Sequence, residues 1–156
     1  MDDRALIQQQ LALSHRLLKY TLNDIADEDA RRIPSAAVSP IVWHVGHVAL
    51  INFSFAGGRD AVRAKLPETY PGLFATGTGG RAEYPAFGAV VNALDDSAAA
   101  LAATVAEADL GTPVEGPFEA WKNHAEMFAF SNNHRWYHIG KITTLRALLG
   151  KPRLFG

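Results

Sequence analysis

Two histidines placed four residues apart are the residues of this sequence best suited to chemistry. They belong to the segment His134-Arg135-Trp136-Tyr137-His138, which lies inside the clearest helical pattern of the chain. Residues i and i+4 share one face of a helix, with Cβ atoms about 5–6 Å apart, so both imidazoles can bind one metal ion. A third imidazole from another helix would leave coordination positions open, as in catalytic metal sites. The spacing therefore predicts a metal site that includes this pair.

A third ligand is available far upstream, in the segment WHVGH at residues 43–47. His44 and His47 stand three residues apart and flank one helix face, so the spacing leaves open which of them points toward the pair. His124 precedes the pair by ten residues, about 15 Å along the same helix, which is too far to share the ion. His15 stands alone and is expected to be an ordinary surface or core histidine.

A His-x-x-x-His pattern also has a purely structural interpretation. The chain has six histidines, so one such spacing can arise by chance. The pair lies among apolar residues, where unpartnered imidazoles are costly, and metal binding is one way to satisfy them. Hydrogen bonds within a core or an interface are another. The residues by themselves leave both interpretations open.

Length and composition restrict the class of protein. A chain of 156 residues with 48% hydrophobic and 20% charged residues fits one globular domain, spanning residues 1–156. A net charge of −1 predicts no nucleic-acid partner. The absence of cysteine excludes disulfides, thiolate ligands and cysteine nucleophiles. No uninterrupted run of 18 apolar residues and no signal-like start occur, so we expect a cytoplasmic protein without a membrane partner.

Four helical segments account for most of the chain and predict an all-α fold. The first helix has an apolar stripe formed by Leu6, Leu13, Leu17 and Leu18. The second begins with Ser39 as N-cap and Pro40 at the first helical position, and ends at Gly57-Gly58.

The third helix is expected from Pro85 to about residue 111, and the fourth from Pro117 to Leu149, with a kink near residues 131–133 or Gly140. A long loop at residues 67–85 separates the second and third helices. Its Thr-Gly segment at residues 76–80 lacks the G-x-G-x-x-G spacing, so we interpret it as a flexible loop rather than a nucleotide site.

Two of these segments resemble the DinB/YfiT-like superfamily of metal-dependent enzymes. SPIVWHVGHVA at residues 39–49 is similar to its second-helix signature, in which the histidine four residues after the tryptophan is a ligand. Residues 134–150 are similar to its C-terminal helix. The resemblance implies that His47, His134 and His138 bind the metal. It also implies an up-down-down-up four-helix bundle, in which the long loop between helices 2 and 3 makes the crossover. Lys141 departs from the family, which often has Gln there.

The resemblance implies a function as well. A divalent metal ion, with zinc or nickel favoured over iron or manganese, would activate a thiol or water of a small-molecule substrate. Similar proteins include transferases for low-molecular-weight thiols, a maleylpyruvate isomerase and the thiol-binding half of an ergothioneine-forming enzyme. With no cysteine in the chain, the thiol must come from the substrate.

Family members often form homodimers, and we expect one here. No general base can be named from the sequence. Replacing His44 or His124 by alanine should leave metal affinity within a few-fold, since neither is expected to reach the ion. The alternative is a helical-bundle dimer that is structural or that binds metal without catalysis.

Overall fold

The computed structural model describes residues 2–80, 83–114 and 116–154, and these residues form helices and connecting segments without any strand. The all-α prediction is therefore confirmed. Four helices are long: α1 (Asp3–Leu22), α3 (Ile41–Lys65), α5 (Phe87–Glu107) and α6 (His124–Leu148). The short elements are α2 (Asp27–Arg31), α4 (Tyr70–Phe74) and the 3₁₀ helix η1 (Pro117–Glu119).

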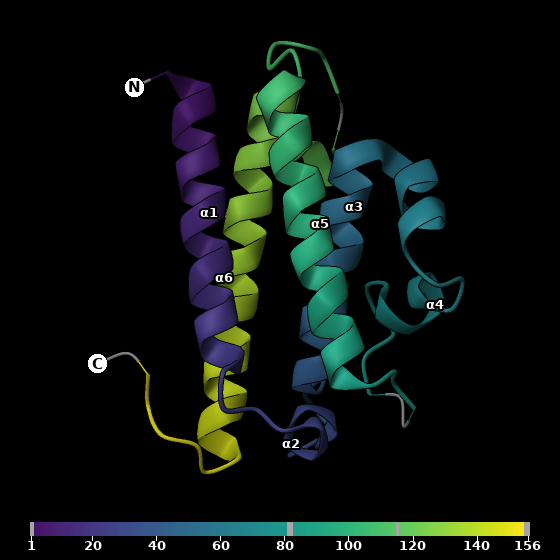
Figure 1. Cartoon of the computed structure of the whole chain (residues 1–156), viewed down its shortest axis with the longest axis vertical. Coiled ribbons are helices and arrows are strands. Elements are labelled where there is room, and N and C mark those ends of the chain that lie inside the picture. The colour runs from purple at the N-terminus through teal and green to yellow at the C-terminus, as the bar shows by residue number, and fades with distance from the viewer. Residues whose placement is uncertain (1, 81–82, 115, 155–156) are drawn as a thin grey trace.

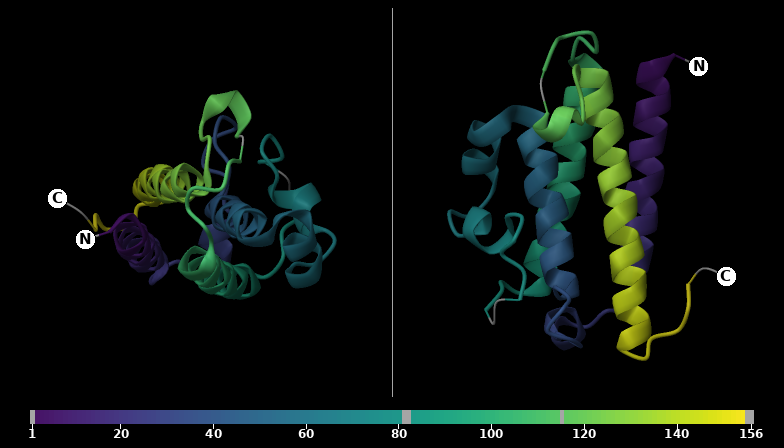
Figure 2. Two further views of the ribbon diagram at one scale, coloured as in Figure 1. Left: turned by 90° about the horizontal axis from the view of Figure 1, so that it is seen from above. Right: turned by 180° about the vertical axis from the view of Figure 1, so that it is seen from behind.

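The four long helices lie side by side (Figures 1 and 2). The chain runs in one direction along α1 and α6, and in the opposite direction along α3 and α5 (Figure 1). Helix α3 contacts α5 and α6, and α1 contacts α6 and α5, while α4 packs against the outside of α3. The two helices that carry the predicted metal ligands, α3 and α6, are thus direct neighbours.

The first half of α3 is buried on all sides. Every residue from Ile41 to Leu50 is buried, including both histidines of the WHVGH segment. The reason is that α5, α6 and α4 cover different faces of the helix. An imidazole in such an environment needs a polar partner, because burying an unbonded polar group is costly. The contacts of His44 and His47 therefore show how their buried ring nitrogens are satisfied.

Three helix boundaries differ from the sequence prediction. Pro40, rather than Ser39, is the N-cap residue of α3. Gly57-Gly58 does not end this helix but introduces a break within it, with Gly58 at a φ of 64°, after which the helix continues to Lys65. Helix α6 begins at His124 and runs without interruption, whereas Pro117 starts the separate helix η1.

The predicted apolar stripe of α1 is wrong for two of its members. Leu6 and Leu13 are 44% and 41% exposed, whereas Leu18 is fully buried. The inward face of the helix includes Ile7, Leu11 and two polar residues, Ser14 and Thr21. Those two hydroxyls donate hydrogen bonds to carbonyls of their own helix, which makes their burial tolerable.

The segment between α3 and α5 has more structure than a flexible loop. It contains α4, with Tyr70 and Phe74 buried, and the Thr78 hydroxyl contacts the carbonyls of Leu73 and Ala75 at 2.7 Å. Two residues of the predicted loop, 81 and 82, lie outside the described residues. Within the described part, the segment forms a cover on the outer face of α3.

Two helices, α3 and α5, are long and apolar enough to cross a bilayer when judged only by length and composition. In α3, 67% of the most apolar window is buried inside the protein, against 28% in α5. Core helices of globular proteins meet the same criterion, so the finding is weak evidence for a membrane span.

Candidate metal centre

Three imidazole nitrogens converge between α3 and α6. The Nε2 atom of His134 lies 3.1 Å from Nε2 of His47 and 3.0 Å from Nε2 of His138. Potential ligand atoms of the three residues all lie within 4.8 Å of one another. The i,i+4 spacing on α6 and the packing of α3 on α6 together bring about this arrangement. The structure thus places next to one another the three histidines that the sequence resemblance implied as ligands.

The donor set fits a divalent metal ion. Nitrogens bound to one ion at about 2.0–2.1 Å in tetrahedral geometry lie roughly 3.3 Å apart, close to the separations found here. The Nδ1 atom of His47 lies 2.7 Å from the Phe74 carbonyl oxygen. A carbonyl can only accept, so Nδ1 carries the hydrogen and Nε2 of the neutral ring keeps its lone pair. Metal-bound histidines commonly donate their other N–H group in this way.

His44 contacts the centre from the side away from the converging nitrogens. Its Nδ1 atom lies 2.9 Å from Nδ1 of His138. When His138 donates its Nδ1–H to His44, its Nε2 atom is left without hydrogen and able to bind a metal ion. His44 is not one of the converging histidines, but it touches one of them, a contact that the sequence did not predict. Sequence spacing alone could not show which ring atoms would face each other.

The four histidines are neutral at pH 7. Burial, together with the neighbouring His47 and the positive charge of Lys141 near His44 and of Arg135 near His134, lowers the pKa of His44 and of His134 to about 4. Burial also lowers the pKa of His47, and it lowers that of His138 strongly. Neutral imidazoles carry the lone pairs that metal binding requires. The environment therefore keeps the candidate ligands in the state that binds metal.

Trp43 holds the ring of His47 from one side. The two rings stack with centroids 4.8 Å apart and an interplanar angle of 11°. The indole Nε1–H donates a hydrogen bond of 3.1 Å to the Thr78 hydroxyl. The Thr-Gly segment, which the sequence identified only as a loop, thereby positions the residue that packs on a candidate ligand. The WHVGH motif contained Trp43, but nothing in the sequence pointed to its partner.

Gly46 makes the contact between α3 and α4 possible. A Cβ atom at this position would overlap the ring of Phe74. Because Gly46 has no side chain, α4 approaches α3 closely enough for the Phe74 carbonyl to reach His47. The glycine between the two histidines of the motif thus contributes to the geometry of the centre.

The side of the centre formed by α6 is less covered. His134 is half-buried, whereas His138 is 2% exposed. The ring of Tyr137 meets His138 edge-on, with centroids 5.0 Å apart, and the Nζ atom of Lys141 lies 5.3 Å from the Tyr137 ring. Lys141 is exposed, so a positive charge stands near the more open side of the centre.

The two remaining histidines are not part of the cluster. Nδ1 of His124 lies 3.0 Å from the Asp109 carbonyl oxygen, near the first turn of α6. His15 on α1 faces Asp95 on α5, at 3.2 Å. These positions agree with the expectation that neither would reach the ion.

The comparisons with known proteins gave one result. A family model described as the DinB superfamily matches residues 10–142, a range that includes the three converging histidines. The comparisons with curated proteins and with solved structures gave no match.

Proposed function

This chain belongs to the DinB superfamily, and we propose that it is a metal-dependent enzyme whose divalent ion is held by His47, His134 and His138. The observation that carries the proposal is the convergence of three imidazole nitrogens from two packed helices. Zinc and nickel are the first candidates, because both readily accept imidazole ligands, and iron and manganese accept them as well. Membership of the superfamily supports the same proposal.

The chemistry follows from the number of ligands. Three protein ligands leave coordination positions for substrate or water, and a bound ion lowers the pKa of a thiol or water there to give a nucleophile at neutral pH. The Phe74 carbonyl and His44 fix the orientation of His47 and His138, while burial keeps all three rings unprotonated. The protein would thus provide a rigid, neutral binding site.

A low-molecular-weight thiol is the substrate class that we propose. The chain has no cysteine, so no thiolate of its own can serve as nucleophile. The exposed ammonium of Lys141, one turn beyond His138, supports a thiol that carries a negative charge elsewhere in the molecule. Glutathione and similar anionic thiols meet this description.

The fold assignment belongs to the same proposal. The directions of α1, α3, α5 and α6 support an up-down-down-up four-helix bundle. The segment from residue 66 to residue 86, which includes α4, would be the crossover between helices of the same direction. This topology is the one that the superfamily resemblance implies.

Cobalt substitution tests whether the centre is open to a thiol. We expect the Co²⁺-loaded protein to develop a thiolate-to-cobalt absorption band when glutathione is added, because a free coordination position accepts the sulfur. The His138→Ala variant serves as the control and should not give the protein-dependent band. A cobalt spectrum that responds neither to thiol nor to pH between about 6 and 9 would indicate a closed, non-catalytic metal site instead.

A further inference from the structure

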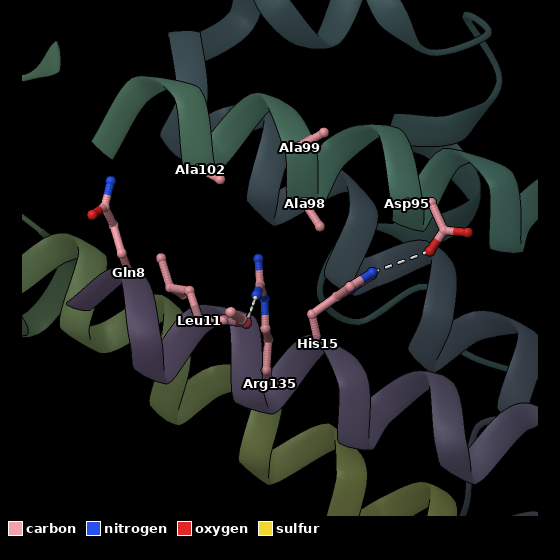
Figure 3. A pocket seen from close by; sticks show the side chains of 9 residues that line it. Gln8, Leu11, His15, Asp95, Ala98, Ala99, Ala102 and Arg135 are labelled. Carbon is pink, nitrogen blue, oxygen red and sulfur yellow. Dashed lines mark hydrogen bonds and ion pairs between the residues drawn. The ribbon is translucent and has the colours of Figure 1, made fainter. Parts of the chain in front are cut away.

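A groove between α1 and α5 is lined by residues of these two helices and by Arg135 of α6. The groove has a volume of about 300 Å³, which is at the lower end of the range for ligand pockets. Its floor is formed by Leu11 and Arg135, and its walls include Ala98 and Ala102 of α5 (Figure 3). The three candidate metal ligands do not line it. The groove is therefore a feature separate from the metal centre.

The floor of the groove carries a buried positive charge. The side chain of Arg135 extends from α6 between α1 and α5, with its guanidinium group directed toward Ala98 and Ala102 (Figure 3). Arg135 is only 1% exposed. A guanidinium group remains charged at neutral pH, and a buried charge is costly unless an opposite charge and hydrogen bonds compensate it.

The protein supplies hydrogen bonds to Arg135 but no carboxylate. Nη1 donates to the Leu11 carbonyl oxygen at 2.8 Å, and Nη2 donates to Oδ1 of Asn52 at 3.2 Å. Nε makes a longer contact of 3.4 Å to the same Asn52 oxygen. Both acceptors are neutral, and the guanidinium group has more N–H donors than these bonds use. Among the described residues, no carboxylate forms an ion pair with Arg135.

A second buried arginine, unlike Arg135, has a carboxylate partner. Arg146, 2% exposed and also on α6, forms an ion pair with Asp24 through both Nη atoms. Asp95, at one end of the groove, cannot play that role for Arg135, because it binds Lys19 at 2.6 Å and faces His15. Arg135 is thus a buried cation whose counter-charge the described residues do not provide.

The other walls of the groove indicate what kind of anion fits. Ala98 and Ala102, together with Leu11, give the groove an apolar surface next to the guanidinium group. The groove volume equals that of roughly ten water molecules. At the far end, Nδ1 of His15 is a buried polar atom without a hydrogen-bond partner among the described residues.

We propose that this groove binds a small carboxylic acid with a short apolar body, its carboxylate on Arg135 and its carbon chain along Ala98 and Ala102. A planar carboxylate matches the fork of N–H donors on a guanidinium group. The apolar chain gains by leaving water for the alanine-lined walls. A single guanidinium group matches a single carboxylate, and no other lysine or arginine of the described residues lines the groove to favour a phosphate.

Isothermal titration calorimetry with sodium hexanoate tests this proposal. Hexanoate has an apolar chain of suitable length, and hexanamide is a neutral molecule of nearly the same shape. We expect saturable binding of hexanoate and at least about tenfold weaker binding of hexanamide, because a hydrogen-bonded charge interaction is lost. Equal affinity for the two compounds, or the absence of saturable heat with hexanoate at millimolar concentrations, would overturn the proposal.

Three variants distinguish the groove from any binding of carboxylate at the histidines. Ala102→Leu fills the groove from an exposed position of α5 and should weaken hexanoate binding at least about tenfold. Ala103 is the neighbouring residue, which is exposed and does not line the groove. Ala103→Leu should therefore bind hexanoate with the affinity of the wild type. Arg135→Met should abolish hexanoate binding. If this variant does not fold, the affinity of Ala102→Leu for hexanoate tests the proposed site instead. Unchanged affinity in Ala102→Leu would contradict the proposed site.

Discussion

The second ring nitrogen of each histidine distinguishes the three candidate ligands from one another. His47 is held by the Phe74 carbonyl and His138 by His44, whereas Nδ1 of His134 is buried without a hydrogen-bond partner among the described residues. Metal-binding histidines are normally oriented through this second nitrogen, and losing such a contact weakens metal affinity. We therefore expect the residues that contact His47 and His138 to matter for metal binding as well as the ligands themselves.

His44 provides the clearest test of this expectation. Replacing His44 by alanine should weaken metal affinity by about 10–100-fold, since Nδ1 of His138 loses its partner. His44→Asn should restore part of the affinity, because the amide oxygen can accept the same hydrogen bond. Competition titration with a chromophoric chelator measures both variants.

The control for this experiment is His124→Ala, which removes a histidine whose contact is with the Asp109 carbonyl and not with the metal centre. Its metal affinity should remain within a few-fold of the wild type. If His44→Ala behaves like His124→Ala, then His44 has no role in orienting His138.

Helix α4 acts on the centre through its close packing against α3. The contact exists because Gly46 leaves space for Phe74, whose ring belongs to the core and whose carbonyl binds His47. Trp43, which lies on α3 like Gly46, is fixed by Thr78 from the segment that follows α4. The segment between α3 and α5 is thus part of the support of the metal centre, and changes in its packing should affect metal binding.

Gly46→Ala tests this connection. The new methyl group would overlap the Phe74 ring, so α4 must shift, and we expect the protein to lose about 1–3 kcal/mol of stability and to bind metal more weakly. Thermal unfolding and the chelator titration measure the two effects. Gly72→Ala, in α4 itself, meets no atom within 4 Å and should be nearly neutral. An equally small effect at Gly46 would contradict the role assigned to this contact.

Some features of the histidine cluster could be predicted from the sequence, whereas others depend on tertiary packing. The i,i+4 spacing placed His134 and His138 on one face because it depends only on helix geometry. The choice of His47 over His44 came from the superfamily resemblance, since local geometry allowed both. Contacts such as Trp43 with Thr78 depend on tertiary packing and left no signal in the local pattern.

The face of α1 was predicted less well. Leu6 and Leu13 suggested one buried stripe, whereas the packing of α5 and α6 selects the face with Ile7 and Leu11. Buried Ser14 and Thr21 made this second face look polar, although their hydroxyls are satisfied within the helix. Gly57-Gly58 looked like a helix end for a similar reason: glycine indicates a break, but not whether the helix resumes.

The protein as a whole should become less stable in mildly acidic solution when it holds no metal. The pKa of His44 and His134 is about 4 in the folded state, below the value of 6.5 for an unfolded chain. Between these values the unfolded chain binds more protons, so stability falls as the pH drops below about 6.5 and continues to fall to about pH 4. Thermal unfolding of the metal-free protein across this range measures the effect.

The double variant His44→Asn, His134→Gln is the control for this pH dependence, because it removes two of the depressed groups. Its unfolding midpoint should decrease less between about pH 7 and pH 5 than that of the wild type. Identical pH profiles for the two proteins would show that His44 and His134 do not cause the loss of stability.

Association of two chains is expected from the exposed face of α1. Leu6, Leu13 and Tyr20 are 44%, 41% and 46% exposed, and their seven-residue spacing places them on one side of the helix. We expect a homodimer through this side, which Leu13→Lys should disrupt, while Ala103→Lys on α5 should not. Light scattering at micromolar concentrations measures both, and a wild-type protein that is monomeric throughout would rule out the dimer.

The metal content of the protein, purified without an affinity tag, tests the proposed metal centre most directly. Elemental analysis should find one divalent ion per chain in the wild type and far less in His47→Ala, His134→Ala and His138→Ala, because each variant loses one of the converging nitrogens. Loss of metal in His44→Ala but not in His47→Ala would show that the ligand from α3 is wrongly assigned. A wild-type protein that contains no metal and takes up neither zinc nor nickel would contradict the metal centre itself.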